Sequence, residues 1–171
     1  MKKSFLTFIY TFSMTALFFL TIGCQNQAEK AELDKFNAMV QVQNQNKLIV
    51  REVLTAIDSN NFDKLGQLLA EDFVLNAPGL TQPWKKEDIF QAIKAHYASF
   101  PDWTHNIEEM IAEGDKVAVR GTGIGTHKAL YKGIEPTGKK ITQASMSVMT
   151  IIDGKVKHWW VLEDSLGFRQ Q

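Results

Sequence analysis

Cysteine is nearly absent from this sequence of 171 residues, because Cys24 is the only one. A disulfide within one chain is therefore excluded, and the cysteine content says nothing about the redox compartment. A net charge is absent as well, since 19 lysines and arginines balance 19 aspartates and glutamates. A near-neutral chain gives no reason to expect a nucleic acid as a partner. Internal repeats and low-complexity segments are also missing.

Motifs that supply metal, phosphate or nucleophile chemistry are missing too. The four histidines are scattered, and none stands at ligand spacing to another or to a paired acid. We therefore expect no metal and no cofactor. The glycines at 121–125 lie in a predicted strand and not between a strand and a helix, so they form no phosphate-binding loop. A Gly-x-Ser-x-Gly elbow, which would present a nucleophilic serine, does not occur.

The N-terminal residues 1–23 have the pattern of a secretory signal peptide. Two lysines precede an uncharged run at 5–22, which ends in Gly23-Cys24. This segment resembles a bacterial lipobox, which implies cleavage before Cys24, a lipid on that cysteine and a place in the bacterial cell envelope. The alternative is an uncleaved anchor, since about 18 apolar residues is the lower limit for crossing a bilayer. We expect the lipid, and not the folded domain, to contact the membrane.

The mature chain divides into a polar tether with the start of a helix, at 24–46, and one domain, at 47–171. Apolar residues at helical spacing predict helices at 31–57, 62–69 and 85–100. Alternation and turn residues predict strands at 71–79, 105–112, 116–125, 141–152 and 155–164. Asp153-Gly154 predicts a hairpin between the last two. Helices followed by strands favour an α+β fold, with the helices on one face of a curved antiparallel sheet.

Short motifs in a fixed order and spacing run from Lys47 to Gln171. They are Phe100-Pro101-Asp102, Glu113-Gly114-Asp115, Val119-Arg120, Gly125-Thr126-His127, Gly133-Ile134, Pro136-Thr137-Gly138, Asp153-Gly154-Lys155, Trp160 and Asp164-Ser165-Leu166-Gly167. In this the chain resembles the SnoaL-like polyketide cyclases, also called ester cyclases. The resemblance implies a cone-shaped, nuclear-transport-factor-like fold, in which a bent sheet wraps around helices and encloses an apolar pocket. It also implies that Asp164 is the acid/base of an intramolecular aldol ring closure.

The last strand carries the candidate catalytic residue. Alternation puts Trp160, Leu162 and Asp164 on one face of this strand, and Trp159 and Val161 on the other. We expect the first face to line the pocket. An aspartate at the mouth of an aromatic cavity is poorly hydrated and can take a proton from the carbon beside a carbonyl. The alternative is that Asp164 only caps the turn that follows.

Three more residues are candidates for substrate binding. His127 and Arg120 lie on opposite faces of a regular strand, so one of them lines the pocket while the other makes a structural contact. Asn76 stands where the family often has a histidine, and an amide can orient a ligand carbonyl but cannot shuttle a proton.

Two functions from different classes stay open. The first is an enzyme of the cyclase, isomerase or hydrolase type, which acts on a small apolar carbonyl compound with Asp164 as acid/base. The second is a non-catalytic module that binds a small ligand or associates with itself. We also expect a homodimer, formed through the exposed face of the sheet at Trp159 and Val161.

Overall fold

The computed structural model describes the backbone from Lys2 to Gln171 and the side chains from Gln27 onward. The side chains of the predicted signal peptide and of the predicted lipidation site, Cys24, lie outside the described residues. The chain forms two compact units, residues 1–41 and 42–171. Among the residues that the structure describes, no helix has an apolar stretch long enough to cross a bilayer.

The predicted helices are present, with ends set by local chemistry. They are α1 (Lys2–Asp58), α2 (Phe62–Leu68) and α3 (Lys86–Ser99), followed by a short C-terminal α4 (Ser165–Arg169) that the sequence did not predict. α1 ends at Asp58, and Asn60 in the turn that follows has a φ of 51°, which asparagine tolerates better than most residues. The Asn61 side chain caps α2 by accepting the Lys64 N–H at 2.9 Å.

Five strands form one sheet in the order β1-β5-β4-β3-β2. They are β1 (Leu69–Asn76), β2 (Thr104–Glu113), β3 (Lys116–Thr126), β4 (Lys140–Ile152) and β5 (Lys155–Glu163). The hairpin between β4 and β5 turns at Asp153 and Gly154, whose φ angles of 50° and 74° are those of the expected tight turn.

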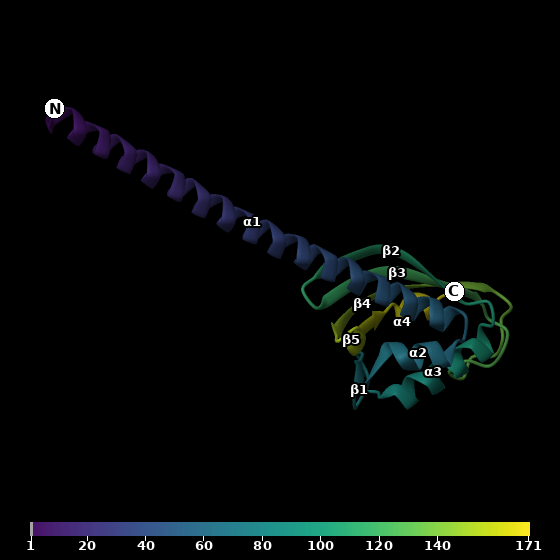
Figure 1. The fold of residues 1–171 in the computed structure, drawn as a ribbon. Helices are drawn as coiled ribbons and strands as arrows, with labels where there is room; N and C mark the ends of the chain where they lie inside the picture. Colours follow the sequence, from purple (N-terminus) through teal and green to yellow (C-terminus); the bar gives the residue numbers. More distant parts are fainter. Residues whose placement is uncertain (1) are drawn as a thin grey trace. The chain divides into compact units, whose positions relative to one another are not determined.

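The sheet is mixed and not purely antiparallel, which corrects the predicted topology. β1 runs parallel to β5, while the other three pairs are antiparallel. A parallel pair needs a long connection, and α3 with strands β2 to β4 supplies it. The α+β class is confirmed: within residues 42–171, the end of α1 together with α2 and α3 covers one face of the curved sheet (Figure 1).

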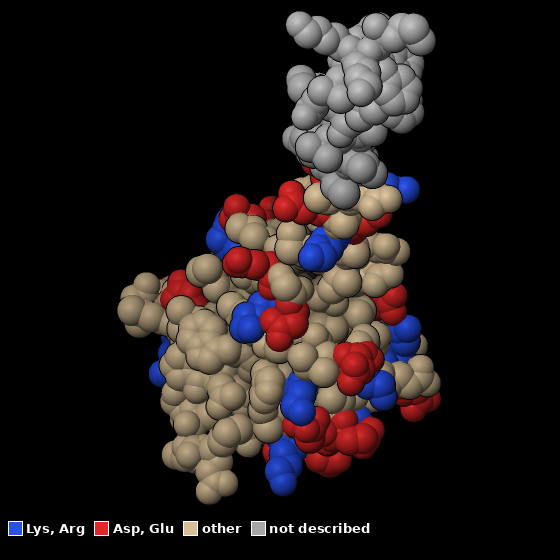
Figure 2. Space-filling model, turned by 60° about the vertical axis from the view of Figure 1, so that its left-hand side comes forward, with Lys and Arg blue, Asp and Glu red and all other residues tan. Residues whose placement is uncertain are grey.

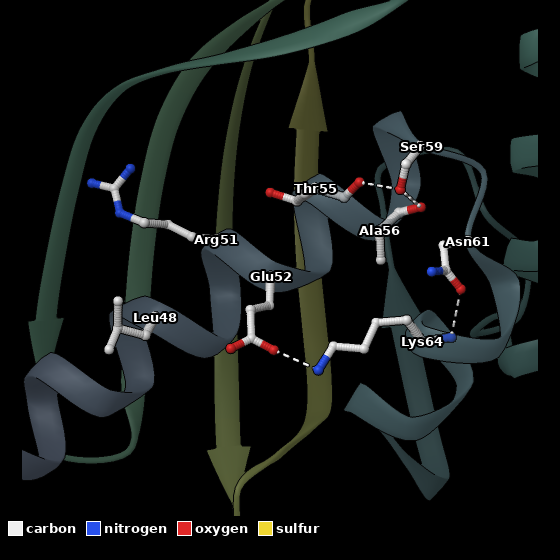
Figure 3. Close-up of a pocket in the computed structure, with 8 residues that line it drawn as sticks. All are labelled: Leu48, Arg51, Glu52, Thr55, Ala56, Ser59, Asn61 and Lys64. Atoms are coloured by element: carbon white, nitrogen blue, oxygen red, sulfur yellow. Dashed lines mark hydrogen bonds and ion pairs between the residues drawn. The ribbon is translucent and has the colours of Figure 1, made fainter.

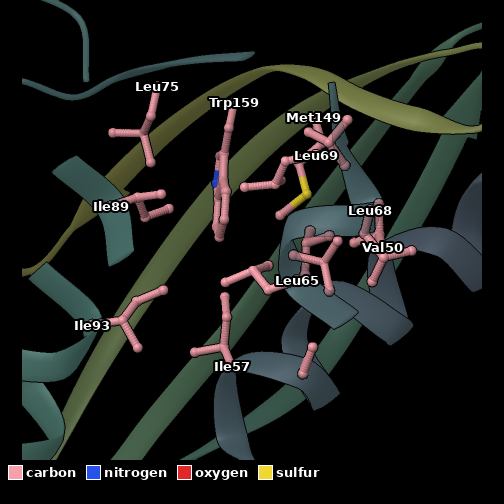
Figure 4. Packing of buried hydrophobic residues seen from close by; sticks show 14 of the residues in the cluster. Val50, Ile57, Leu65, Leu68, Leu69, Leu75, Ile89, Ile93, Met149 and Trp159 are labelled. Carbon is pink, nitrogen blue, oxygen red and sulfur yellow. The ribbon is translucent and has the colours of Figure 1, made fainter. Parts of the chain in front are cut away.

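The core lies between the helices and that face of the sheet. α1 contributes Val50 and Ile57, and α3 contributes Ile89 and Ile93. Figure 4 shows Ile57, Ile89 and Ile93 directed toward Trp159 of β5, whereas Val50 lies farther from this indole. Trp159 is only 8% exposed, so the sheet presents a large aromatic surface to the helices.

The face that β5 turns inward differs from the prediction. Trp160 and Leu162 are 44% and 45% exposed and point away from the helices, so the expectation that they face the interior is wrong. The register explains this, because Trp159 pairs with the buried Leu75 and Trp160 with the exposed Asn76. Burial of Trp159 also makes the predicted dimer contact through that residue wrong.

Glycines in β3 make room for a second buried tryptophan. A Cβ on Gly123 would collide with the indole of Trp103, and one on Gly125 would lie 2.7 Å from Trp103 Cε3. Trp103 is buried, so its ring has no open space to move into. The glycine-rich segment of β3 is therefore a packing surface for this indole.

Candidate functional site

Four of the predicted site residues lie together, but on the exposed face of the sheet. Asn76 pairs with Trp160 across β1 and β5. Leu162 pairs with Met146 of β4, whose other neighbour is Arg120 of β3. All four side chains point away from the helices. They form a polar-rimmed surface, and none of them faces the interior.

Arg120 is tied to β2 by two carboxylates. Its Nε donates to Glu109 Oε2 at 3.2 Å, and its Nη1 donates to Glu108. Bonding to Glu109 and the charge of Glu108 raise the pKa of Arg120, and the Thr122 hydroxyl together with Arg120 lowers the pKa of Glu108. The guanidinium is thus neutralised by two acids, and its contacts are those of a link between strands.

His127 lies on the opposite side of the sheet from Arg120, as strand alternation predicts. It follows β3 directly and is 4% exposed. Its Nδ1 lies 3.4 Å from the Thr137 hydroxyl, a long and weak contact. Its ring stacks on Phe100 with centroids 5.1 Å apart and 20° between the planes.

Phe100 stacks with two imidazoles. The His96 ring is the second, with centroids 4.9 Å apart, and Trp103, Tyr131 and Phe168 meet Phe100 edge-on. Burial, with smaller effects from His105 and Lys132, lowers the pKa of His96 to about 4, so this ring is neutral near pH 7. Nε2 of both stacked histidines is buried and meets no hydrogen-bond partner among the described residues.

Asp164 is exposed and lies just beyond the end of β5. Its N–H donates to Ala144 O at 2.9 Å, and its Oδ1 accepts the Gly167 N–H at 2.8 Å. It is the N-cap of α4, as the alternative interpretation proposed. The expected aromatic cavity does not shield its carboxylate from water. Phe168, four residues on, packs on Phe100 and Tyr131, so α4 connects Asp164 to the aromatic cluster.

An acid–imidazole pair that the sequence did not predict joins the end of α1 to β2. Asp58 Oδ1 and His105 Nδ1 are 2.5 Å apart, and the Tyr97 hydroxyl donates to the same oxygen at 3.1 Å. Burial, reinforced by the charge of Asp58 and by this bond, raises the pKa of Tyr97. One signal was present in the sequence: an acid in the last turn of a helix opposes the helix dipole, so it needs a partner elsewhere.

A surface hollow of about 300 Å³ lies between α1 and α2 (Figure 3). Its wall includes Arg51 and the ion pair of Glu52 with Lys64, at 2.7 Å. None of the predicted site residues lines it. The hollow is open to solvent and its charges are largely paired, so it does not unite the candidate residues.

In the part of the chain that the structure describes, neither a metal-binding cluster nor the charged surface in view marks a site. Among the residues that the structure describes, no three side chains of histidine, cysteine, aspartate or glutamate lie close enough to hold a metal ion. Figure 2 shows lysines and arginines interspersed with acids on the visible face. Such a mixed surface does not attract polyanions strongly.

Comparison with known proteins agrees with this fold. The family model of the SnoaL-like polyketide cyclases matches residues 47–171. The fold is similar to that of IdmH from Streptomyces antibioticus, with 25% identity, a TM-score of 0.69 and coverage of 74% of this chain and 96% of that one. No curated protein is similar enough in sequence to count as a match.

Two further solved structures share the fold at lower identity. TsrD from Streptomyces laurentii is 21% identical, with a TM-score of 0.67 and coverage of 75% of this chain and 95% of that one. A SnoaL-like polyketide cyclase from Agrobacterium tumefaciens is 17% identical, with a TM-score of 0.63 and coverage of 74% and 96%. Each is matched over nearly its whole length, so these two structures share the fold of this chain.

Proposed function

Because the chain belongs to the SnoaL-like polyketide cyclase family, we propose that its domain binds a small, mainly apolar carbonyl compound and moves a proton on it. Asp164 is the acid/base in this proposal. It takes a proton from the carbon beside the carbonyl and returns one later, a step worth about 10²–10⁴-fold in rate. The reaction is of the cyclase, isomerase or hydrolase type.

The observation that carries this proposal is how Asp164 is held. The cap of α4 uses only Oδ1, and Oδ2 has no hydrogen-bond partner among the described residues. A Cβ on Gly167 would collide with the same carboxylate, so glycine leaves room for it. A fixed, accessible carboxylate can meet a ligand without first breaking its cap.

The apolar part of the ligand has a natural place beside α4. Phe168, four residues after Asp164, packs on Phe100 and Tyr131. We propose that the buried His127, whose Nε2 has no partner among the described residues, orients the ligand. The other predicted substrate-binding residues lie on the opposite face of the sheet, away from this cluster: Asn76, Arg120, Trp160 and Leu162.

Two substitutions at one position test Asp164. Asparagine is also a good N-cap, so Asp164→Asn keeps α4 in place while it removes the base. Asp164→Ala removes both the N-cap of α4 and the base. The readout is hydrogen–deuterium exchange of 2-tetralone beside its carbonyl, followed by NMR with the full-length protein. We expect acceleration by the wild type and a loss of about 10²-fold or more in both variants. An Asp164→Asn variant with unchanged exchange refutes this role.

The second candidate function is ligand binding without catalysis. The exposure of Asp164 favours it, because a well-hydrated carboxylate is a weaker base for carbon acids than a shielded one. Titration calorimetry with 2-tetralone separates the two functions. Saturable binding without accelerated exchange identifies a binding module, whereas accelerated exchange that depends on Asp164 identifies the enzyme.

We also propose a homodimer through the exposed face of the sheet. Two cross-strand pairs meet there, Val148 with Trp160 and Met146 with Leu162. All four side chains are at least 38% exposed, although water is an unfavourable neighbour for such a cluster. A second copy of this face would cover it. In this proposal Trp160, and not the buried Trp159, makes the contact between the two copies.

The place of the protein in the cell is a further proposal, namely the bacterial envelope, reached by export and lipid attachment at Cys24. The basic start, the apolar run and Gly23-Cys24 support it. Intact-mass spectrometry of the protein from its native host tests it. A mature chain that begins at Cys24 with added lipid is expected, and Cys24→Ser should retain residues 1–23. A wild-type chain that keeps those residues would instead be held by an uncleaved anchor.

A further inference from the structure

We propose that His105 is a second acid/base group of this domain, positioned by Asp58 and Tyr97 and acting on the same carbonyl compound as Asp164. The inference rests on the proposed function, because it needs a ligand with a removable proton. It concerns residues far apart in the sequence, which the fold brings together where α1 ends beside β2.

The Asp58 carboxylate is held by donors on both oxygens. Oδ1 accepts from His105 Nδ1 at 2.5 Å and from the Tyr97 hydroxyl at 3.1 Å, while Oδ2 accepts the backbone N–H of His105 at 3.1 Å. This pattern fixes the imidazole as the tautomer with its proton on Nδ1 when it is neutral. Nε2 then carries the lone pair that can accept a proton.

His105 Nε2 is available for this task. No hydrogen bond joins it to another described residue, and the side chains of His105 and Asp58 are 28% and 25% exposed. The pair is therefore shielded enough to keep its geometry and open enough for a ligand to reach it. An aspartate that fixes one imidazole nitrogen while the other stays free is the arrangement that general-base catalysis requires.

A role in stability alone explains less of this arrangement. Asp58 is the last residue of α1, where the helix dipole disfavours a negative charge. A neutral side chain would join α1 to the backbone of β2 without that penalty. The carboxylate does more than join the two elements, because it accepts on both oxygens and also stabilises a positive charge on the imidazole when Nε2 takes a proton.

His105 and Asp164 lie at the same end of the sheet. The Asp164 N–H bonds to Ala144 on β4, Ala144 pairs with Thr122 on β3, and Thr122 pairs with Asn106 on β2, next to His105. Three strand spacings separate the two backbones by about 14 Å. This separation is too long for a direct proton transfer between His105 and Asp164, but a bound ligand can lie between them. The two groups therefore act at different atoms of the ligand.

In the step that we assign to His105, a C–H bond beside the carbonyl breaks. Its electron pair moves into the enolate, and the proton goes to Nε2, which gives an imidazolium paired with the Asp58 carboxylate. The imidazolium then returns a proton to the same carbon, so that the enolate becomes the ketone again and His105 becomes neutral. One proton leaves the ligand and one returns, so the step needs no oxidant, reductant or co-reactant.

The test uses the full-length protein and the exchange of 2-tetralone in D₂O. His105→Ala should lower the exchange rate by about 10²-fold or more. Added imidazole should restore it above the rate of imidazole without protein, because the side chain leaves an accessible gap. His105→Asn is the matched control: its amide N–H still reaches toward Asp58, so it should unfold near the wild-type temperature and yet lose exchange.

Asp58 is tested as a positioning residue through that rescue. In the double variant Asp58→Asn/His105→Ala the added imidazole lacks its carboxylate partner, and the rescue should fail. Unchanged exchange in His105→Ala, or rescue that is independent of Asp58, overturns the inference and leaves Asp164 as the acid/base. Wild-type protein without any acceleration instead refutes the proposed function. The two failures are therefore distinct.

Discussion

Trp159 and Trp160 are neighbours in sequence that lie on opposite faces of the sheet. Trp159 packs beneath α3 beside Ile89 and Ile93 (Figure 4). Trp160 pairs with Val148 and is 44% exposed on the other face. One indole therefore stabilises the monomer, and the other is free to contact a partner. Substitutions at the two positions should separate folding from association.

Trp159→Ala should lower the free energy of unfolding by about 3–5 kcal/mol, because it removes a buried indole and leaves a cavity. Trp160→Ala should change it by about 1 kcal/mol or less, since the side chain is partly exposed already. Urea unfolding of both variants followed by circular dichroism measures the difference. Equal losses would contradict the assignment of inner and outer faces on β5.

Leu162→Arg should convert a dimer into a monomer, because it places a charge in the centre of the proposed apolar contact. Sedimentation velocity at micromolar concentration is the measurement. Leu166→Arg is the matched control, since this leucine of α4 is exposed outside the two cross-strand pairs, and the dimer should persist. A wild-type protein that sediments as a monomer would rule out the association itself.

Gly123→Ala should destabilise the fold by about 1–3 kcal/mol, because the new methyl group overlaps the buried indole of Trp103. Gly66→Ala provides the contrast. A Cβ there would lie 3.7 Å from Phe90 Cζ, an ordinary contact, and alanine favours a helix over glycine by about 0.5–1 kcal/mol. The midpoint temperature of thermal unfolding should fall for Gly123→Ala and rise for Gly66→Ala. A change in the same direction for both variants would refute this packing.

Stability should fall on mild acidification through His96. Its pKa is about 4 in the folded protein and near 6.5 in the unfolded chain, so between these values only the unfolded chain binds the proton. Between about pH 7.5 and pH 5 the protein should lose about 2 kcal/mol from this group. His96→Phe keeps an aromatic ring without a titrating nitrogen and should show a smaller loss. Urea unfolding at both pH values compares them, and identical losses would exclude His96 as the cause.

Local chemistry made most of the elements predictable. The turn after Asp58, the tight hairpin at Asp153-Gly154 and the stop of α3 before Pro101 all follow from residues at the point where the chain turns. α4 was missed because its few residues carry no apolar period. The sequence nevertheless predicted, as one of two alternatives, that Asp164 caps the turn that follows β5.

Two features of the sheet could not be predicted from local pattern. Both faces of β5 carry a tryptophan followed by an aliphatic residue, so hydrophobicity alone gave no reason to bury Trp159 and not Trp160. The parallel pairing of β1 with β5 depends on the path of the whole chain. That pairing sets Trp159 beside the buried Leu75, so the indole of Trp159, and not that of Trp160, faces the core.

In the candidate site as well, only residues within a local motif could be predicted from the sequence. Asp164 was identified by its place in a family motif, which is local in sequence. Asp58 and His105 are 47 positions apart and share no motif, so only the packing of α1 against β2 joins them. Contacts between distant segments are the part of a site that a single sequence conceals.

The strand order has a consequence for synthesis. Among the strands that the structure describes, β5 is translated last, yet it lies between β1 and β4 and alone pairs with β1. A nascent chain can form the β2–β3–β4 meander early, but β1 waits on the ribosome until residues 155–163 have left the exit tunnel. Loss of residues 155–163 would thus separate β1 from the β2–β3–β4 meander, and not merely remove a strand at one edge of the sheet.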